Sequence, residues 1–219
     1  MKTRSGRARV RVAVRPFLDA LLAGDKVSAL QLSSAALVLL GSRVAVFSDL
    51  LQPAQYEIGE LWYAGRIGVA GEHRATAIVE SVVSSLPPTP SKLPVRRGSR
   101  CLLAALGEEQ HVLGLRVFGL ALEDEGWTTR WLGARTSLDK LLAAAEAKPP
   151  HVVALSAAYL PAVQPLKLAI DRIKLTGARV MVGGPSFNRI PDLWRRVGAD
   201  AHGSDARVSL VLARRLLAR

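Results

Sequence analysis

Residues 101–114, CLLAALGEEQHVLG, decide how this chain folds. The run Cys101–Leu106 is short and apolar, which is typical of a buried strand. The amphipathic residues after it predict a helix over His111–Glu125. His111 is therefore expected on a loop at the carboxyl edge of the strand, where the helix begins. Open α/β sheets bind ligands at that edge, so Glu109–Gly114 is a candidate binding loop.

Strand and helix patterns alternate from this segment to the end of the chain. Further strands are predicted at Thr128–Leu132, Val152–Ser156, Arg179–Val182 and, more weakly, Ala199–Ala201. Further helices are predicted at Leu138–Ala147, Gln164–Thr176 and Ala206–Leu217. Repeated strand–helix units imply a parallel sheet covered on both faces. The fold class is therefore α/β, with a Rossmann-like (flavodoxin-like) sheet of about five strands.

Residues 13–86 carry a helical pattern and predict a small bundle. Asp25 is expected to cap a helix over Val27–Leu40, which Gly41 would end. Arg43–Gln52 predicts a second helix, and Pro53 fits the first turn of a third. The last helix is expected at Val69–Leu86. Its apolar stripe comprises Ala75, Ile78, Val79, Val82, Val83 and Leu86.

A proline-rich segment separates the two halves. Pro87–Pro94 contains four prolines in eight residues, which can neither continue a helix nor form a central strand. We expect a basic flexible arm over residues 1–12, the bundle over 13–86, a linker over 87–99 and the α/β domain over 100–219.

Composition narrows the class of protein. Cys101 is the only cysteine, which excludes an internal disulfide and any cysteine-based metal cluster and fits a reducing cytoplasm. No apolar run approaches the ~20 residues that span a bilayer. We therefore expect a soluble, cytoplasmic protein without membrane association.

The net charge is +12, from 30 basic and 18 acidic residues. Half of this excess lies in the first fifteen residues. Its six members are Lys2, Arg4, Arg7, Arg9, Arg11 and Arg15. Such an arm can make weak, non-specific contacts with nucleic-acid phosphates, and it also fits a solvated tail.

The chemistry of His111 depends on its surroundings. A helix N-terminus favours neutral imidazole, which is the form that binds metals. Glu109 favours the cation, but as a hydrogen-bond acceptor it also orients the ring. One histidine beside one glutamate fits a surface pair as well. His151 and His202 have no evident partners and are interpreted as ordinary residues.

A second cluster is expected in the bundle. Glu72 falls on the apolar stripe of the last helix, where a buried carboxylate must either pair or face a ligand. His73 flanks the stripe, and Trp62 precedes the short turn between the two helices. These three residues can share one surface. The alternative is a Glu–His contact between helices beneath a core tryptophan.

Two strand ends complete the set of candidates. Ser156 ends the third strand, and Gly183-Gly184 end the fourth, on the same sheet edge as His111. Paired glycines let a ligand approach the backbone closely, although a tight turn also explains them.

Together these features resemble the cobalamin-binding module of CarH-type photoreceptors and of methionine-synthase-like corrinoid proteins, over about residues 27–187. The family motif is an acidic residue, any residue, His, two of any kind, then Gly. It is matched here by Glu109, His111 and Gly114. The resemblance implies a corrinoid between the bundle and the Rossmann-like domain, with His111 as the lower axial ligand of cobalt.

The same resemblance assigns the strand ends. Ser156 matches the serine that lines the pocket for the nucleotide tail of the corrinoid, and Gly183 and Gly184 match the glycines along that tail. The chain departs from the family where Ala157-Ala158 follow the serine, and it has Glu109 where Asp is commoner.

The motif in the bundle distinguishes between kinds of corrinoid protein more sharply than the residues of the α/β domain do. CarH-like sensors carry Trp, nine residues, then Glu-His, and this chain has Trp62, nine residues, then Glu72-His73. The match implies adenosylcobalamin as cofactor, with these residues capping and contacting the adenosyl group. It also implies light sensing and transcription regulation, in which photolysis of the Co–C bond moves the bundle and changes assembly or partner binding.

One departure concerns the light product. Tyr63 stands where the best-known sensors have a histidine that ligates cobalt after illumination, so the upper ligand is left to water, His73 or another residue.

A second departure concerns DNA. Only about 26 residues precede Val27, too few for the MerR-like domain of these sensors. We expect a homo-oligomer, a dimer or tetramer, with a DNA-binding or effector protein acting in trans.

Two other functions fit the same residues. One is a corrinoid carrier of a methyltransferase system, which would hold methylcobalamin. The other is a light-insensitive cobalamin sensor or binding protein. No nucleophile–base pair or phosphate loop indicates catalysis of its own, so the chain is not expected to be an enzyme.

Overall fold

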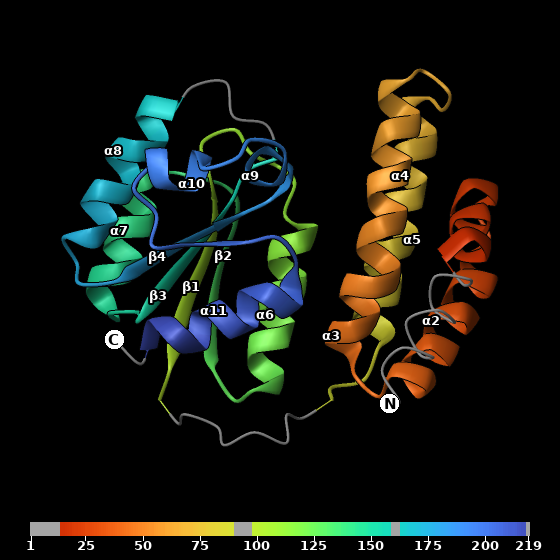
Figure 1. Cartoon of the computed structure of the whole chain (residues 1–219), viewed down its shortest axis with the longest axis horizontal. Helices are drawn as coiled ribbons and strands as arrows, with labels where there is room; N and C mark the ends of the chain where they lie inside the picture. Colours follow the sequence, from red (N-terminus) through yellow and green to blue (C-terminus); the bar gives the residue numbers. More distant parts are fainter. Residues whose placement is uncertain (1–13, 90–97, 159–162, 218–219) are drawn as a thin grey trace. The chain divides into compact units, whose positions relative to one another are not determined.

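The computed structural model describes residues 14–89, 98–158 and 163–217. The chain divides into two compact units, residues 1–89 and 90–219, which are described separately (Figure 1). The predicted basic arm and residues 90–97 of the predicted linker lie outside the described residues. No helix in the described part of the chain is long and apolar enough to cross a membrane.

The first unit is helical throughout, as predicted. A helix over residues 14–23 leads into α2 (Lys26–Leu40). There follow α3 (Arg43–Val46), the π-helical turn η1 (Phe47–Leu51), α4 (Gln52–Tyr63) and α5 (Val69–Ser85). The predicted apolar stripe of α5 is confirmed, since its six members are all buried.

The ends of α2 follow the predicted capping residues. Asp25 accepts hydrogen bonds from the backbone N–H and the hydroxyl of Ser28, at 3.0 and 2.6 Å. The hydrogen bond from the Ser28 hydroxyl lowers the pKa of Asp25 below its usual value. Gly41 ends the helix in the left-handed conformation, with φ of 65°.

Pro53 lies in the first turn of α4, as predicted, but no loop separates this helix from the one before it. The chain stays helical from Arg43 to Tyr63, and it widens to a π-turn just before the proline. Proline has no N–H, and in an α-helix its ring clashes with the carbonyl four residues earlier. The N–H of Gln52 bonds instead to the carbonyl of Phe47, five residues back. The wider turn accommodates Pro53 without ending the helix.

The second unit is the predicted α/β fold. Its strands are β1 (Arg100–Leu106), β2 (Thr128–Thr136), β3 (Val152–Ser156), β4 (Arg179–Gly183) and β5 (Ala201–Gly203). They pair in parallel in the order β2-β1-β3-β4-β5, which is the flavodoxin-like order.

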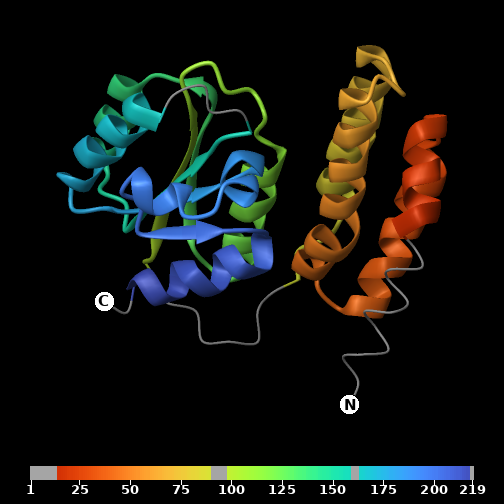
Figure 2. The same cartoon turned by 45° about the horizontal axis from the view of Figure 1, so that its top comes forward.

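Helices cover both faces of this sheet (Figures 1 and 2). On one face α7 (Leu138–Ala147) packs beside α8 (Val163–Lys174). On the other, α6 (Leu113–Asp124) packs beside α11 (Ala206–Leu217). The sequence patterns did not predict the two short helices α9 (Pro185–Arg189) and α10 (Leu193–Arg196).

Several predicted boundaries shift, and the second strand continues to Thr136 rather than ending at Leu132. Helix α6 begins at Leu113, two residues later than predicted, and His111 lies on the loop before it, as expected. The fifth strand begins at Ala201 rather than Ala199. Just before it, Asp200 contacts Val180 twice: its N–H donates to the Val180 carbonyl at 2.8 Å, and its carboxylate accepts from the Val180 N–H at 2.8 Å.

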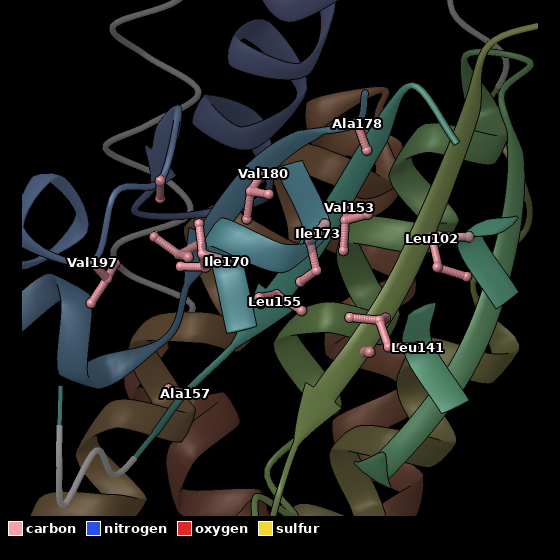
Figure 3. Close-up of a cluster of buried hydrophobic side chains, with 14 of the residues drawn as sticks. Leu102, Leu141, Val153, Leu155, Ala157, Ile170, Ile173, Ala178, Val180 and Val197 are labelled. Atoms are coloured by element: carbon pink, nitrogen blue, oxygen red, sulfur yellow. The ribbon is translucent and has the colours of Figure 1, made fainter. Parts of the chain in front are cut away.

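The main core of the α/β unit lies beneath α7 and α8 (Figure 3). Leu102, Val153, Leu155 and Val180 from three adjacent strands meet Leu141 and two isoleucines of α8 there. Ala157, one residue beyond β3, also belongs to this core. The start of the loop after β3 is therefore anchored by packing.

Candidate functional site

The order of the strands places a topological switch point at one edge of the sheet. The chain leaves β1 toward β2 on one side and β3 toward β4 on the other, so the carboxyl ends of β1 and β3 form the topological switch point. Glu109 and His111 follow β1 at this point, and Ser156 ends β3. The structure thus brings the predicted residues of the α/β unit to one edge.

Glu109 forms the centre of this edge. Its side chain is 8% exposed, whereas that of His111 is 74% exposed. Oε1 of Glu109 lies 2.6 Å from Nδ1 of His111 and accepts from the His111 N–H at 2.8 Å. Oε2 accepts from the N–H of Ala158 at 2.6 Å. An ionised carboxylate only accepts, so Nδ1 carries the proton and a metal would be bound through Nε2.

Two further contacts fix the loop after β1. The hydroxyl of Ser156 lies 3.5 Å from the carbonyl oxygen of His111, at the outer limit of a hydrogen bond. The N–H of Arg135, at the end of β2, donates to the carbonyl of Glu109 at 3.0 Å. The ends of β1, β2 and β3 therefore all contact this loop.

The two glycines at the end of β4 are required by neighbouring backbone. A Cβ on Gly184 would lie 2.5 Å from the carbonyl oxygen of Ala157, and one on Gly183 would lie 3.2 Å from that of Gly203. Gly184 also has φ of 103°, which other residues rarely adopt. The close approach of neighbouring backbone therefore explains both glycines. The sequence had suggested only a tight turn as the alternative to a ligand contact.

Gly114 has a different environment. It is the second residue of α6, and a Cβ placed on it would meet no heavy atom within 4 Å. Three residues from His111, the surface of α6 is therefore bare backbone facing open space.

In the helical unit, Glu72 is held by a network that the sequence did not reveal. The hydroxyl of Thr76 donates to Oε1 of Glu72 at 2.9 Å, and Nε2 of Gln55 donates to the Thr76 hydroxyl at 3.1 Å. Gln55 lies on α4 and Thr76 on α5, so the network joins the two helices. Thr76 stands four residues after Glu72, a spacing that could have signalled the first contact.

The other predicted residues of this unit are exposed. Trp62 is 48% exposed, so the alternative of a core tryptophan above a Glu–His contact is wrong. His73 is also exposed, with Nε2 3.6 Å from the Glu72 carboxylate. Trp62 lies in the last turn of α4 and Glu72 in the first turn of α5, and both lie on the turn side of the Gln55–Thr76 contact.

Two histidines expected to lack partners have them. Nδ1 of His151 accepts from the N–H of Arg100 at 3.1 Å, at the opposite edge of the sheet. Nε2 of His202 lies 2.8 Å from the side-chain oxygen of Asn188. Burial lowers the pKa of His202, and it raises the pKa of the Cys101 thiol far above its usual value. Both effects are explained by packing within the fold.

Within the described ranges, no group of three or more His, Cys, Asp or Glu side chains could hold a metal ion.

Comparison with known proteins agrees with these features. A family model described as the B12 binding domain matches residues 99–211, and a second model of the same description matches residues 13–86. Together they account for both units of the structure.

Two curated relatives are transcriptional repressors of Myxococcus xanthus. The HTH-type repressor CarH is 30% identical over 141 residues, which is 63% of this chain and 46% of the relative. The HTH-type repressor CarA is 38% identical over 95 residues, which is 42% of this chain and 31% of the relative. The chain thus spans less than half the length of either protein.

A solved structure shares the fold of nearly the whole chain. The monomethylamine corrinoid protein of Methanosarcina barkeri superposes with a TM-score of 0.75 at 19% identity, covering 93% of this chain and 98% of that one. A helical unit followed by a five-stranded parallel sheet is therefore an architecture found in a known corrinoid protein.

Proposed function

The chain belongs to the B12-binding domain family, and on that premise we propose that it is an adenosylcobalamin-binding light sensor that regulates a partner. In this proposal His111 is the lower axial ligand of cobalt. Photolysis of the Co–C bond would change the position of the helical unit, and with it assembly or partner binding. The observation that carries the proposal is the exposed indole of Trp62 in the last turn of α4, with Glu72 and His73 in the first turns of α5.

The α/β unit fits a corrinoid on its own chemistry. The exposed ring of His111 has its Nδ1 on a buried carboxylate, the arrangement that fixes the tautomer of a metal-binding histidine. The bare backbone at Gly114 leaves room beside that ring for a flat macrocycle. Ser156, Gly183 and Gly184 at the same edge would contact the nucleotide tail.

The helical unit favours the adenosyl form. The half-exposed Trp62 offers a stacking surface for adenine, and the Glu72 carboxylate on the next helix offers an acceptor for ribose hydroxyls. Glu72 is fixed by Thr76 and Gln55, so its direction is set before a ligand arrives. A methyl group would use neither feature.

Bound adenosylcobalamin would supply a Co–C bond that visible light breaks. The protein residues would do the rest: His111 would bind the lower face, Glu109 would hold its ring, and Trp62 would exclude water from the upper face. The chain would then act as a sensor and not as an enzyme, as a homo-oligomer or on a DNA-binding or effector protein in trans.

The axial assignment is tested by absorption spectra of the protein loaded with adenosylcobalamin. We expect the histidine-ligated spectrum in the wild type and its loss, with weaker binding, in His111→Ala. His151→Gln is the matched control, because His151 lies at the opposite edge of the sheet. An unchanged spectrum and affinity in His111→Ala would overturn the assignment.

Light sensing is tested by sedimentation of the loaded protein in the dark and after green illumination. The proposal predicts a change in assembled mass, or in affinity for an added partner, that depends on light. Identical profiles together with an unchanged partner affinity would leave a light-insensitive cobalamin sensor as the better description.

The alternative is a corrinoid carrier of a methyltransferase system, whose fold is compatible with that of this chain. A carrier must leave the upper face open to its methyl donor, and Trp62 argues against that. Transfer of a methyl group to cobalt on this protein by a partner enzyme would reverse the ranking.

A further inference from the structure

Helix α2 is apolar around most of its circumference. Its inner side packs within the helical unit, next to α3 and α5, and carries the buried residues Ala29, Ser33 and Ala36. With 3.6 residues per turn, a second set of residues lies on the opposite side. This set, here called the outer stripe, is exposed and consists of Val27, Gln31, Ser34, Ala35 and Val38. A helix that is apolar on all sides is normally buried on all sides, so the outer stripe is expected to have a partner.

The outer stripe offers apolar surface without charge. Val27 and Val38 are 65% and 86% exposed, and Leu39 beside them is 43% exposed. The chain has no charged residue between Lys26 and Arg43. A nucleic acid or a charged peptide would therefore find no charge to pair with along the stripe. Shape and apolar contact must select the partner instead.

The neighbouring helix, residues 14–23, leaves the outer stripe open. A groove of about 500 Å³ runs between this helix and α2. Pro16 and Ala20 line one wall, and Gln31 and Ala35 of the stripe belong to the other. A further helix can therefore reach the stripe without displacing residues 14–23.

We propose that the outer stripe packs against the outer stripe of a second copy of this chain, in a two-fold antiparallel helix pair. The stripe is complementary to its own reverse. When Val27 lies level with Val38 of the second copy, Gln31 lies level with Ser34. Valine then meets valine at both ends of the contact. On each side of the two-fold axis an amide meets a hydroxyl, and these two groups can hydrogen-bond to each other.

The same pairing suits the ends of the helix. Lys26 lies level with Leu39 of the second copy, in the last turn of its α2. That turn has the negative end of the helix dipole and no basic residue of its own. Lys26 therefore supplies a cation where the partner helix lacks one. Parallel pairing would instead bring the two Lys26 side chains together.

This contact needs no cofactor, and in that respect it goes beyond the homo-oligomer of the proposed function. From Val27 to Val38 the stripe is about 16.5 Å long. A helix pair of this length buries less than the ~1,200–2,000 Å² of a stable interface. We therefore expect a weak dimer that dissociates at micromolar concentrations.

Sedimentation of the full chain without cobalamin, at a series of concentrations, measures this equilibrium. We expect the wild type to dimerise and Ala35→Glu to associate at least about tenfold more weakly, because it places a charge inside the contact. Ala35 is exposed and glutamate is a good helix former, so this variant should fold. Ala77→Glu is the matched control. Ala77 is an exposed residue of α5, and the same change there should leave association unchanged.

Introduced cysteines test the direction of the pair. Val27→Cys and Val38→Cys, mixed and oxidised, should form a disulfide with each other. Either variant alone should stay uncrosslinked, because its two cysteines would lie about 16.5 Å apart, beyond the ~7 Å between Cα atoms that a disulfide spans. The native Cys101 is buried and does not compete.

Three results would overturn the proposal: a monomer at every concentration, equal weakening by Ala77→Glu, or crosslinking of either cysteine variant alone as strong as in the mixture. Because no cobalamin is present, the outcome is independent of the proposed function. If light leaves the loaded protein unchanged while Ala35→Glu still weakens the dimer, then light sensing fails and the contact through α2 stands.

Discussion

The carbonyl oxygen of Ala157 occupies the space where a side chain on Gly184 would begin. A Cβ on Gly184 would lie 2.5 Å from that oxygen, nearer than real Cβ contacts allow. Ala157 cannot move away easily, because it is buried in the core beneath α7 and α8. The ends of β3 and β4 thus approach through backbone alone, at the edge where the cofactor is proposed to bind.

We therefore expect Gly184→Ala to destabilise the protein by about 2–3 kcal/mol, from overlap with Ala157 and from its φ of 103°. Urea denaturation followed by circular dichroism measures the free energy of unfolding. Gly177→Ala is the control, because Gly177 has φ of 83° but open space around it. It should lose about 1 kcal/mol, the cost of the left-handed conformation. Equal losses in the two variants would contradict the role of the close contact.

Gly114 should respond in the opposite way. It lies in α6 with no heavy atom near an added Cβ, so alanine should stabilise the protein without cobalamin by about 0.5–1 kcal/mol. The same methyl group would enter the open space beside His111, so cobalamin should bind more weakly. Urea denaturation and equilibrium dialysis measure the two effects. A Gly114→Ala variant that binds cobalamin as well as the wild type would show that the macrocycle does not lie there.

How far the sequence predicts this fold depends on which interactions define each element. The bounds of α7, β3 and α11 follow from short apolar runs and turn residues, and they were predicted to the residue. The π-turn before Pro53 was not predicted. It differs from an α-helical turn only in which backbone carbonyl accepts each N–H, and side-chain periodicity does not reveal that difference.

The candidate site also contains contacts that the sequence predicts and contacts that it does not. The contact between Glu109 and His111 is local and follows from their spacing. Ala158 is 49 residues from Glu109, and its contact is made by a backbone N–H that carries no sequence signal. The network from Gln55 to Glu72 depends on how α4 packs against α5, which periodicity does not specify.

Stability should depend on pH through His202. Burial lowers its folded-state pKa below the usual value, so the unfolded state binds a proton more readily. The contribution is present above the unfolded pKa of about 6.5, and it is lost as the pH falls from there through the lower folded-state pKa. His202→Gln can still donate to Asn188 but cannot titrate. Melting temperatures between pH 8 and pH 5 should fall less in this variant than in the wild type, and parallel curves would contradict the assignment.

Cys101 should report opening of the α/β unit. It is the only cysteine, it is buried in β1, and burial raises the pKa of its thiol so that little thiolate forms at neutral pH. Labelling by a maleimide should therefore be slow in the folded protein and should accelerate in urea with unfolding of the sheet. Rapid labelling under native conditions would mean that β1 is exposed by local opening.

Trp62 gives the sharpest test of which corrinoid is bound. The residue is 48% exposed, so Trp62→Ala should lower the free energy of unfolding by only about 1–2 kcal/mol, from the buried half of the indole. If the indole stacks on the adenosyl group, the variant should bind adenosylcobalamin about tenfold or more weakly, while its affinity for methylcobalamin stays the same. Tyr63→Ala is the matched control, an adjacent aromatic residue that is 86% exposed. Titration of each variant with both cobalamins measures the affinities. Equal weakening for the two forms would indicate general contact with the corrin, and equal affinities throughout would remove Trp62 from the site and favour the carrier function.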